Sequence, residues 1–266
     1  MKSLPFGYYM YKVRDPQNQI ITSILKSTLK KLYFLLFGVP DLHSHIRYRC
    51  VKHQIENLKT LDVGGGEGYF SFSLAVNGLQ DITLSPYAEM EFKNATYIKE
   101  SDHRFDHIKI IKDDAELLNS FEDESFEQII VLDVFEHVVN LNNAVEQVIR
   151  KLSVGGRLIV SVPTHDYPRF FEETFDKNIG HLRHFSFDQL KSLFEARGLR
   201  TETIKPYTYF YTSKLCSIYY KYNLGILNLI LSPFLNWLSF LTEFIPTHHF
   251  TELVAVFIKK RQSDVL

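Results

Sequence analysis

Short apolar runs alternate with amphipathic stretches through the middle of this chain. Five runs rich in Ile, Val and Leu are bounded by Gly, Asp or Pro, as expected of strands that are buried on both faces of a sheet. They read TLDVG, DITLS, IKIIKD, EQIIVLDV and GRLIVSV and lie between residues 60 and 162. Between the last two runs, one helical face collects Leu141, Val145, Val148 and Leu152. Such alternation predicts a parallel sheet with helices on both faces.

The segment after residue 163 continues this pattern. In SFDQLKSLFEARG, Ser186 suits the N-cap of a helix, Gln189 completes a capping box, and Gly198 ends the helix. RTETIKPY and LVAVFIKK then supply two further strands, which makes seven in all. We therefore expect a Rossmann-like α/β fold with a seven-stranded, mostly parallel sheet, an N-terminal helix and an apolar helical insertion before the last strand.

Two apolar segments lie outside the sheet pattern. Residues 20–37 carry apolar side chains at helical spacing, with lysines among the remainder. They predict either a helix packed on its own domain or a basic amphipathic helix on a membrane surface. Residues 222–242 contain no charge and reach the minimum length of a membrane span, but asparagines and Pro233 interrupt them. We expect two short apolar helices that form a lid here, with contact to lipid left open.

These segments define four regions: an N-terminal helical extension (1–57), a core (58–206), an aromatic and apolar helical insertion (207–250), and a final strand with its tail (251–266). The formal net charge of -1 gives no general attraction to nucleic acid. The two cysteines lie far apart without metal-ligand spacing, and the first residues do not read as a signal peptide. We expect a cytoplasmic protein, either free or peripheral at the inner face of the membrane.

The stretch LDVGGGEGYF, residues 61–70, has four glycines in five positions between the first strand and the first helix. In an open α/β sheet, ligands bind at the carboxyl ends of the strands, and glycines there let the backbone approach a ligand closely. A dinucleotide fingerprint, G-x-G-x-x-G, would require glycine where Tyr69 stands. The spacing is instead G-x-G-x-G, formed by Gly64, Gly66 and Gly68 after Asp62, which disfavours a nicotinamide-dependent oxidoreductase.

Four motifs in order resemble the class I S-adenosylmethionine-dependent methyltransferases. They are LDVGGGEGYF, KDDAELL at 112–118, FEQIIVLDVFEHV with VIRKLSVGGRLIVSVPT, and GHLRHFSFDQLKSLFEARGL, and they span about residues 58–200. The last is similar to the subgroup that methylates small molecules, quinones and sugars. The resemblance implies S-adenosylmethionine as cofactor and a small or lipid-linked acceptor, such as a sugar or quinone-like compound, with methylation on oxygen.

The resemblance also assigns cofactor-binding roles. The ammonium group of S-adenosylmethionine would contact Asp62, and the methionine part of the cofactor would lie against the glycines. Its adenine would be read by Asp114 with the backbone of Ala115, and Asp133 would line the same site. The family's acidic residue at the end of the second strand is replaced here by Thr83 or Ser85, with Glu89 or Glu91 in the following turn as substitutes. This departure keeps a second hypothesis open, in which the chain is a catalytically inactive binding or scaffold protein of the same fold.

Candidates for the catalytic base lie after the fourth and fifth strands. Histidines are the preferred candidates, because histidine titrates near physiological pH. We favour His137, then His181, with Asp133 beside them; His165 and His184 are further candidates. We expect no metal, because two histidines in HLRH supply too few ligands. The sequence HSH at 43–45 reads as surface or loop. The aromatic stretch 207–222 predicts a greasy cover for the acceptor or, alternatively, part of the core or of a homodimer interface.

Overall fold

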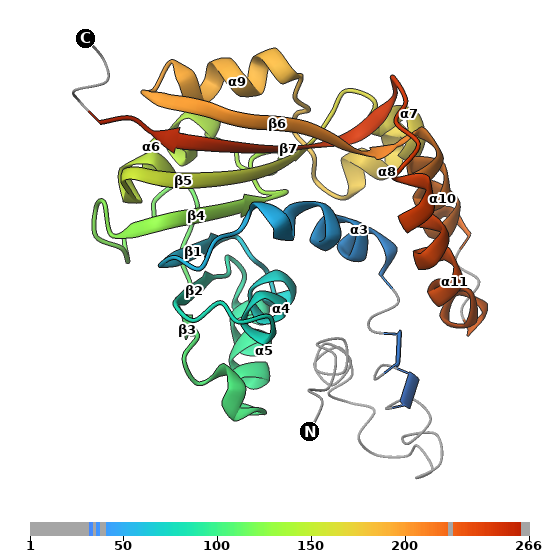
Figure 1. The fold of residues 1–266 in the computed structure, drawn as a ribbon, viewed down its shortest axis with the longest axis horizontal. Coiled ribbons are helices and arrows are strands. Elements are labelled where there is room, and N and C mark those ends of the chain that lie inside the picture. Colours follow the sequence, from blue (N-terminus) through green and yellow to red (C-terminus); the bar gives the residue numbers. More distant parts are fainter. Residues whose placement is uncertain (1–31, 34–35, 38–40, 223–225, 262–266) are drawn as a thin grey trace.

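Seven strands form one sheet in the order β3-β2-β1-β4-β5-β7-β6 (Figure 1). The computed structural model describes residues 32–33, 36–37, 41–222 and 226–261. The strands are β1 (Thr60–Val63), β2 (Ile82–Ser85), β3 (Lys109–Ile110), β4 (Phe126–Leu132), β5 (Leu152–Pro163), β6 (Leu199–Tyr209) and β7 (Phe250–Lys259). Only β7 runs antiparallel to its neighbours among these strands. The predicted Rossmann-like sheet is confirmed.

Helices cover both faces of the sheet. One face packs against α3 (Leu42–Val51), α4 (Tyr69–Val76) and α5 (Glu89–Glu100), and the other against α6 (Leu141–Lys151) and α9 (Phe187–Glu195). Each face has its own core, because alternate residues of a strand point to opposite sides. Two single-turn helices, η2 (Lys52–Gln54) and η3 (His103–Phe105), complete this part.

Local sequence signals explain where the core helices begin. The side chain of Asn140 accepts a hydrogen bond from the Asn143 amide at 3.1 Å and starts α6. Ser186 and Gln189 form the predicted capping box at the start of α9. These caps fix the helices that follow β4 and β5, and so the loops at the carboxyl ends of both strands.

Four more helices gather beyond the carboxyl ends of the central strands (Figure 1). They are α7 (Tyr167–Phe171), α8 (Glu173–Asn178), α10 (Phe210–Lys221) and α11 (Ile226–Thr242). The expected break at Pro233 is wrong, because α11 runs through it as one helix. A proline removes one helical hydrogen bond and strains the preceding turn, while α11 packs against both α3 and α10.

The predicted helix at 20–37 lies mostly outside the described residues. Of that range, Leu32, Tyr33, Leu36 and Phe37 are described, and they are helical. Among the helices of the described ranges, none combines the length and the apolar character needed to cross a bilayer.

Strands β1 and β4 are parallel neighbours at the centre of the sheet, and the strand order reverses between them. In open α/β sheets, such a reversal leaves a crevice at the carboxyl ends of the two strands. The loop after β1 and the loop after β4 meet there, and α3 lies alongside. The candidate site is built at this point.

Candidate functional site

The glycine loop after β1 is tightly packed on its inner side and open on its outer side. A Cβ at Gly65 would lie 2.5 Å from both the Asp62 carboxylate and the Leu84 side chain, so only glycine fits. Gly66 has a φ of +56°, and a Cβ there would meet nothing nearer than 3.8 Å. The loop therefore needs glycine at 65 for space and at 66 for its backbone conformation. Its outer side is free to lie against a ligand.

Asp62 lies beneath this loop with its side chain fixed. It is 1% exposed, and its Oδ2 accepts a hydrogen bond from Ser71 Oγ at 2.6 Å. Burial raises the pKa of Asp62 to about 6, although the Ser71 hydrogen bond opposes the shift. A positively charged partner would strongly stabilise the charged form of such a buried carboxylate.

A pocket of about 400 Å³ opens beside the loop. This volume is within the range of small-molecule sites. Its lining joins residues from four segments of the chain: Gly64, Tyr87, Glu91, Asp113, Asp114, Ala115, Glu116, Asp133, Val134, His137, Val138 and Val139. The pocket thus unites Gly64, Asp114, Ala115, Asp133 and His137 from the sequence predictions.

Five predicted cofactor residues are not part of that lining: Asp62, Gly66, Gly68, Thr83 and Ser85. Thr83 and Ser85 are 3% and 1% exposed on β2, and neither is among the described residues that line the pocket. The Gly64 amide donates to the Ser85 carbonyl at 2.8 Å, so the glycine loop continues the pairing of β1 with β2.

The two glutamates after β2 differ in direction. Glu89 is exposed and pairs with Lys112 at 3.0 Å, on the outside of α5. Glu91 lines the pocket, and its Oε1 is the atom 3.8 Å from the Cβ position of Gly66. Its Oε2 accepts the Ala88 amide at 3.0 Å and so caps α5. One oxygen of Glu91 therefore fixes the helix while the other faces the glycine loop.

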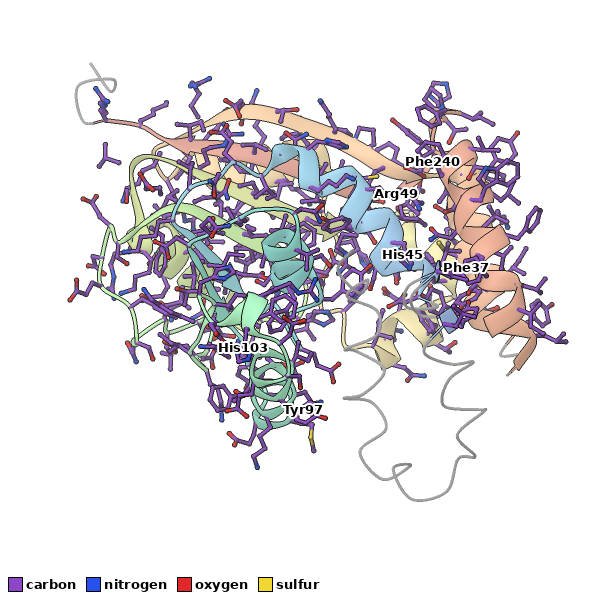
Figure 2. All side chains as sticks on the ribbon, turned by 60° about the horizontal axis from the view of Figure 1, so that its bottom comes forward. Phe37, His45, Arg49, Tyr97, His103 and Phe240 are labelled. Carbon is purple, nitrogen blue, oxygen red and sulfur yellow. The ribbon has the colours of Figure 1, made fainter. Side chains whose placement is uncertain are left out.

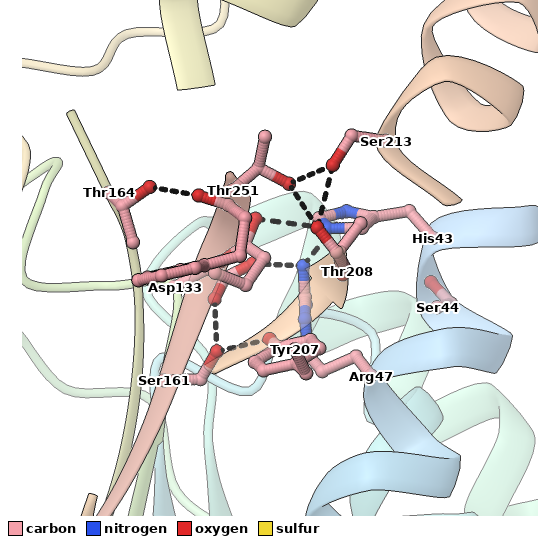
Figure 3. A network of polar contacts seen from close by, with 12 residues as sticks. His43, Ser44, Arg47, Asp133, Ser161, Thr164, Tyr207, Thr208, Ser213 and Thr251 are labelled. Carbon is pink, nitrogen blue, oxygen red and sulfur yellow. Dashed lines mark hydrogen bonds and ion pairs between the residues drawn. The ribbon is translucent and has the colours of Figure 1, made fainter. Parts of the chain in front are cut away.

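Asp133 lies at the end of β4 in a left-handed conformation with a φ of +53°. A non-glycine residue in this region is uncommon and is held by its surroundings. Its Oδ1 accepts from Ser161 Oγ at 2.8 Å, and its Oδ2 pairs with Arg47 of α3 (Figure 3). Burial would raise the pKa of Asp133, but the charge of Arg47, together with those of His43 and His181 and the Ser161 hydrogen bond, outweighs burial and lowers the pKa below its ordinary value. Asp133 is thus an anchored carboxylate anion.

A second pair extends this network along α3. His43 Nε2 lies 3.1 Å from Glu252 Oε1, and His43 Nδ1 lies 3.2 Å from the Arg47 guanidinium (Figure 3). Burial, and then the charge of Asp133, raise the pKa of Glu252 to about 7. The expectation that HSH is a surface or loop segment is wrong, because His43 joins α3 to β7.

The loop after β4 carries Glu136 and His137. Arg183 donates to the carbonyls of Phe135 at 2.7 Å and Val138 at 2.5 Å and so fixes the loop. Glu136 is fully buried, and neither of its oxygens accepts a hydrogen bond from any described residue. Burial and then the charge of Asp133 raise its pKa well above the ordinary value, which favours the neutral acid.

Two imidazoles face this carboxyl group. His137 Nδ1 lies 3.1 Å from the Gly180 carbonyl, and His181 Nδ1 lies 2.7 Å from Asp176 Oδ1. These acceptors fix the proton on Nδ1, which leaves each Nε2 with a free electron pair. Each Nε2 lies 3.9 Å from Glu136 Oε1. The structure therefore brings both preferred base candidates to one point.

His181 is the more enclosed of the two histidines. Its side chain is 6% exposed, against 39% for His137, and the rings are 5.0 Å apart between centroids. Burial lowers the pKa of His181 against the opposing effect of Asp176. His184 also bonds Asp176, at 3.0 Å, whereas His165 points to Gln189 at 3.0 Å on the surface.

Side chains that could hold a cation occur in three groups of the described residues. Donor atoms within each group lie within 4.8 Å of one another. The groups are Glu136 with His137 and His181, Asp176 with His181 and His184, and His43 with Asp133 and Glu252. In the second and third groups, the imidazoles already bond the carboxylates directly.

Comparison with known proteins supplies the family. A sequence profile described as a methyltransferase domain matches residues 39–204, more than half of the chain. The chain belongs to this methyltransferase family. As a member, it is an S-adenosylmethionine-dependent methyltransferase. No curated protein matches the methyltransferase in sequence.

Solved structures agree with this fold. An S-adenosylmethionine-dependent methyltransferase from Thermotoga maritima is 17% identical, with 95% of this chain and 100% of that chain covered, at a TM-score of 0.55. One from Mesorhizobium loti is 13% identical, covering 80% and 97%, at 0.54. The [4+2]-cyclase SpnF is 16% identical, covering 81% and 80%, at 0.59. At these identities the likeness shows the fold alone.

Sequence reasoning missed several residues of this methyltransferase site. Only the tertiary structure identifies Arg47, Glu252 and Asp176, since each of them contacts a partner in another element. Asp176 lies five residues before His181 in the segment DKNIGH, and this spacing matches no catalytic motif that we recognise.

Proposed function

We propose that this methyltransferase transfers a methyl group from S-adenosylmethionine to an oxygen of a small or lipid-linked acceptor, such as a sugar or quinone-like compound. The observation that carries the proposal is the buried pair of His181 and Asp176, one imidazole ring away from the pocket at the glycine loop. A hydroxyl acceptor must lose a proton during transfer, and an imidazole oriented by a carboxylate is suited to take it.

The glycine loop and the pocket beside it suit the parts of the cofactor. The buried carboxylate of Asp62 would accept from its ammonium group, directly or through water, and its methionine part would lie along Gly64, Gly66 and Gly68. The glycine loop allows close backbone approach at Gly66, where a Cβ position has no protein atom nearer than 3.8 Å. Asp114 and the Ala115 backbone would bind the adenine amino group.

We assign the ribose hydroxyls to Glu91. Its free oxygen faces the glycine loop, and a carboxylate accepts stronger hydrogen bonds than the hydroxyls of Thr83 or Ser85. A substitute acid therefore enters from the first turn of α5 where the family has one at the end of β2.

Base catalysis is assigned to His181. When bound, S-adenosylmethionine supplies a methyl group on a positively charged sulfur, which leaves as the neutral sulfide. His181 Nε2 takes the acceptor's hydroxyl proton, and Asp176 stabilises the imidazolium that forms. His137 lies between the pocket and His181 and positions the acceptor. The neutral acid form of Glu136 can donate a hydrogen bond to the acceptor from the other side.

Asp133 is assigned a positioning role in place of base catalysis. A carboxylate whose pKa is lowered by a paired guanidinium is a weak proton acceptor. Through Arg47 it instead holds α3 over the carboxyl ends of β4 and β5.

The test has two stages. Isothermal titration with S-adenosylmethionine and with S-adenosylhomocysteine measures cofactor binding, and labelled methyl transfer to a panel of sugars and hydroxylated quinone precursors measures activity. We expect both ligands to bind, and His181→Gln to keep that binding while losing about 10²- to 10⁴-fold in kcat. Full activity of His181→Gln, or transfer only to amine acceptors, would overturn the oxygen-directed mechanism. No cofactor binding to the folded protein would favour the inactive scaffold instead.

A further inference from the structure

Helix α11 turns its apolar face outward, unlike an ordinary surface helix. Its outer face exposes apolar side chains at successive intervals of three and four residues, and the stripe continues one turn past the helix: Leu227, Ile230, Phe234, Trp237, Leu241 and Phe244. A helix of a globular protein normally turns such a stripe toward the core. Figure 2 shows side chains projecting from α11 on the side that faces away from the body of the protein.

The inner face of α11 is polar and is fixed by hydrogen bonds. Arg49 of α3 donates to Asn236 Oδ1 at 2.5 Å and to Ser239 Oγ at 2.8 Å. Thr242 Oγ1 lies 2.8 Å from Thr212 Oγ1 of α10. Rotating the helix to bury its apolar stripe would break these hydrogen bonds and leave their part-buried polar groups without partners. The outward stripe is therefore built into the fold.

The surroundings of the stripe distinguish lipid from a protein partner. Helical partners that pack on such a stripe normally use charged residues on its flanks, and protein interfaces have a polar rim. Residues 222–242 carry no charge at all, and the flanks of the stripe add Leu231 and Phe240, both exposed. A hydrocarbon surface needs no such polar partners.

The charge beside the stripe is positive. From Thr203 to Thr242 the chain has three lysines and no acidic residue. Lys214 and Lys221 lie on the exposed face of α10, although Lys221 also pairs with Glu172 at 2.5 Å. The next acid, Glu243, points inward and accepts from the amides of Thr208 and Tyr209 at 2.9 and 3.1 Å. Such a pattern complements anionic headgroups.

We propose that the outer faces of α10 and α11 dock this enzyme on the surface of an anionic lipid bilayer. In this arrangement α11 lies in the plane of the headgroup boundary, as expected for an amphipathic helix, with Trp237 and the phenylalanines at the interface. Docking is independent of the identity of the acceptor, so it stands apart from the proposed reaction.

The docking surface also lies next to the candidate site. Phe210 of α10 packs on Phe170 of α7, and Ser217 of α10 donates to the Phe170 carbonyl at 2.6 Å. Tyr167, on the same short helix as Phe170, lies 4.9 Å from His181 between ring centroids. The contacts from the docking surface to the proposed base therefore pass through two helices, α10 and α7.

Trp237 provides the test, because it is the only tryptophan in the chain and is 56% exposed. The full chain is mixed with phosphatidylcholine vesicles or with vesicles that also contain phosphatidylglycerol. We expect a blue shift of Trp237 emission, quenching by brominated lipids, and cosedimentation that is stronger with the anionic vesicles and weaker in high salt. Lys214→Gln should reduce only the part that depends on anionic lipid.

The variant that tests the stripe replaces Ile230 and Phe234 together with Gln, which leaves the reporter in place. It should weaken vesicle binding at least about 10-fold, while Tyr97→Gln, a matched change at a 41% exposed aromatic residue on the distant α5 (Figure 2), leaves binding intact. Both variants should bind S-adenosylmethionine as the parent does, which separates a docking failure from a failure of the reaction.

Three results would overturn docking. One is the absence of an emission shift with either vesicle. The second is equal binding by the Ile230 and Phe234 double variant. The third is Trp237 emission that is already blue-shifted without lipid, with sedimentation showing a dimer, which would assign the stripe to a second copy of the chain.

Discussion

Replacing Glu91 with Gln tests how this methyltransferase compensates for the missing acid at the end of β2. The variant keeps an oxygen that can accept the Ala88 amide, so the cap of α5 survives, since Gln also serves in capping boxes. What it loses is the negative charge that faces the glycine loop. We therefore expect weaker cofactor binding in a protein of nearly unchanged stability.

The magnitude follows from the difference between two kinds of hydrogen bond. A bond to a charged acceptor contributes about 1.5–3 kcal/mol and a neutral one about 0.5–1.5 kcal/mol. Changing Glu91 to Gln should therefore cost about 1–1.5 kcal/mol, which raises the Kd for S-adenosylmethionine about 5- to 13-fold.

Isothermal titration measures the effect, and Glu89→Gln is the matched control. Glu89 lies in the same first turn of α5 but pairs with Lys112 on the outside, so its replacement should leave the Kd unchanged. A cofactor analogue that lacks the ribose hydroxyls sharpens the assignment. The parent should lose affinity for this analogue, and the Glu91 variant should lose much less, because the two changes remove the same interaction.

Two outcomes would refute the reasoning. An unchanged Kd for Glu91→Gln would mean that the carboxylate does not touch the ligand. Equal weakening by Glu89→Gln and Glu91→Gln would mean that the charge of the helix terminus matters and that neither side chain is specific.

Other predictions follow from the same site. Arg47→Met leaves Asp133 as a buried, unpaired charge and should lower the free energy of unfolding by about 3–5 kcal/mol, measured by urea denaturation; Arg47→Lys should lose less, and equal losses would argue against the ion pair. Because protonated His181 cannot take a proton and its pKa lies below 6.5, kcat/KM should be flat above pH 7 and fall about tenfold per unit below that pKa. A profile that rises on acidification would exclude this base. Activity in excess EDTA should equal activity without it, because a neutral Glu136 needs no cation; a loss reversed by a divalent ion would reassign the cluster as a metal site. Gly66→Val, at a φ of +56°, should abolish cofactor binding in titrations while circular dichroism stays that of the parent.

The sequence by itself determined the sheet and the position of the site along the chain. Buried strands, capped helices and the glycine loop are encoded by neighbouring residues, since periodicity and turn chemistry act over a few positions. For this reason the seven strands, the α9 capping box and the place of Gly64 beside a pocket could be predicted. His137 and His181 could be named as candidates because of their place after β4 and β5.

Only the tertiary structure decided which side chains meet. Arg47 and Asp133 are 86 positions apart, and His43 and Glu252 are 209 apart, so no local pattern links them. The local sequence also gave a wrong expectation for the insertion, because the proline at 233 does not break α11 into two helices. In α11, hydrogen bonds from Arg49 fix the polar side against α3, so the apolar side faces outward. A helical wheel of α11 alone does not contain this tertiary contact.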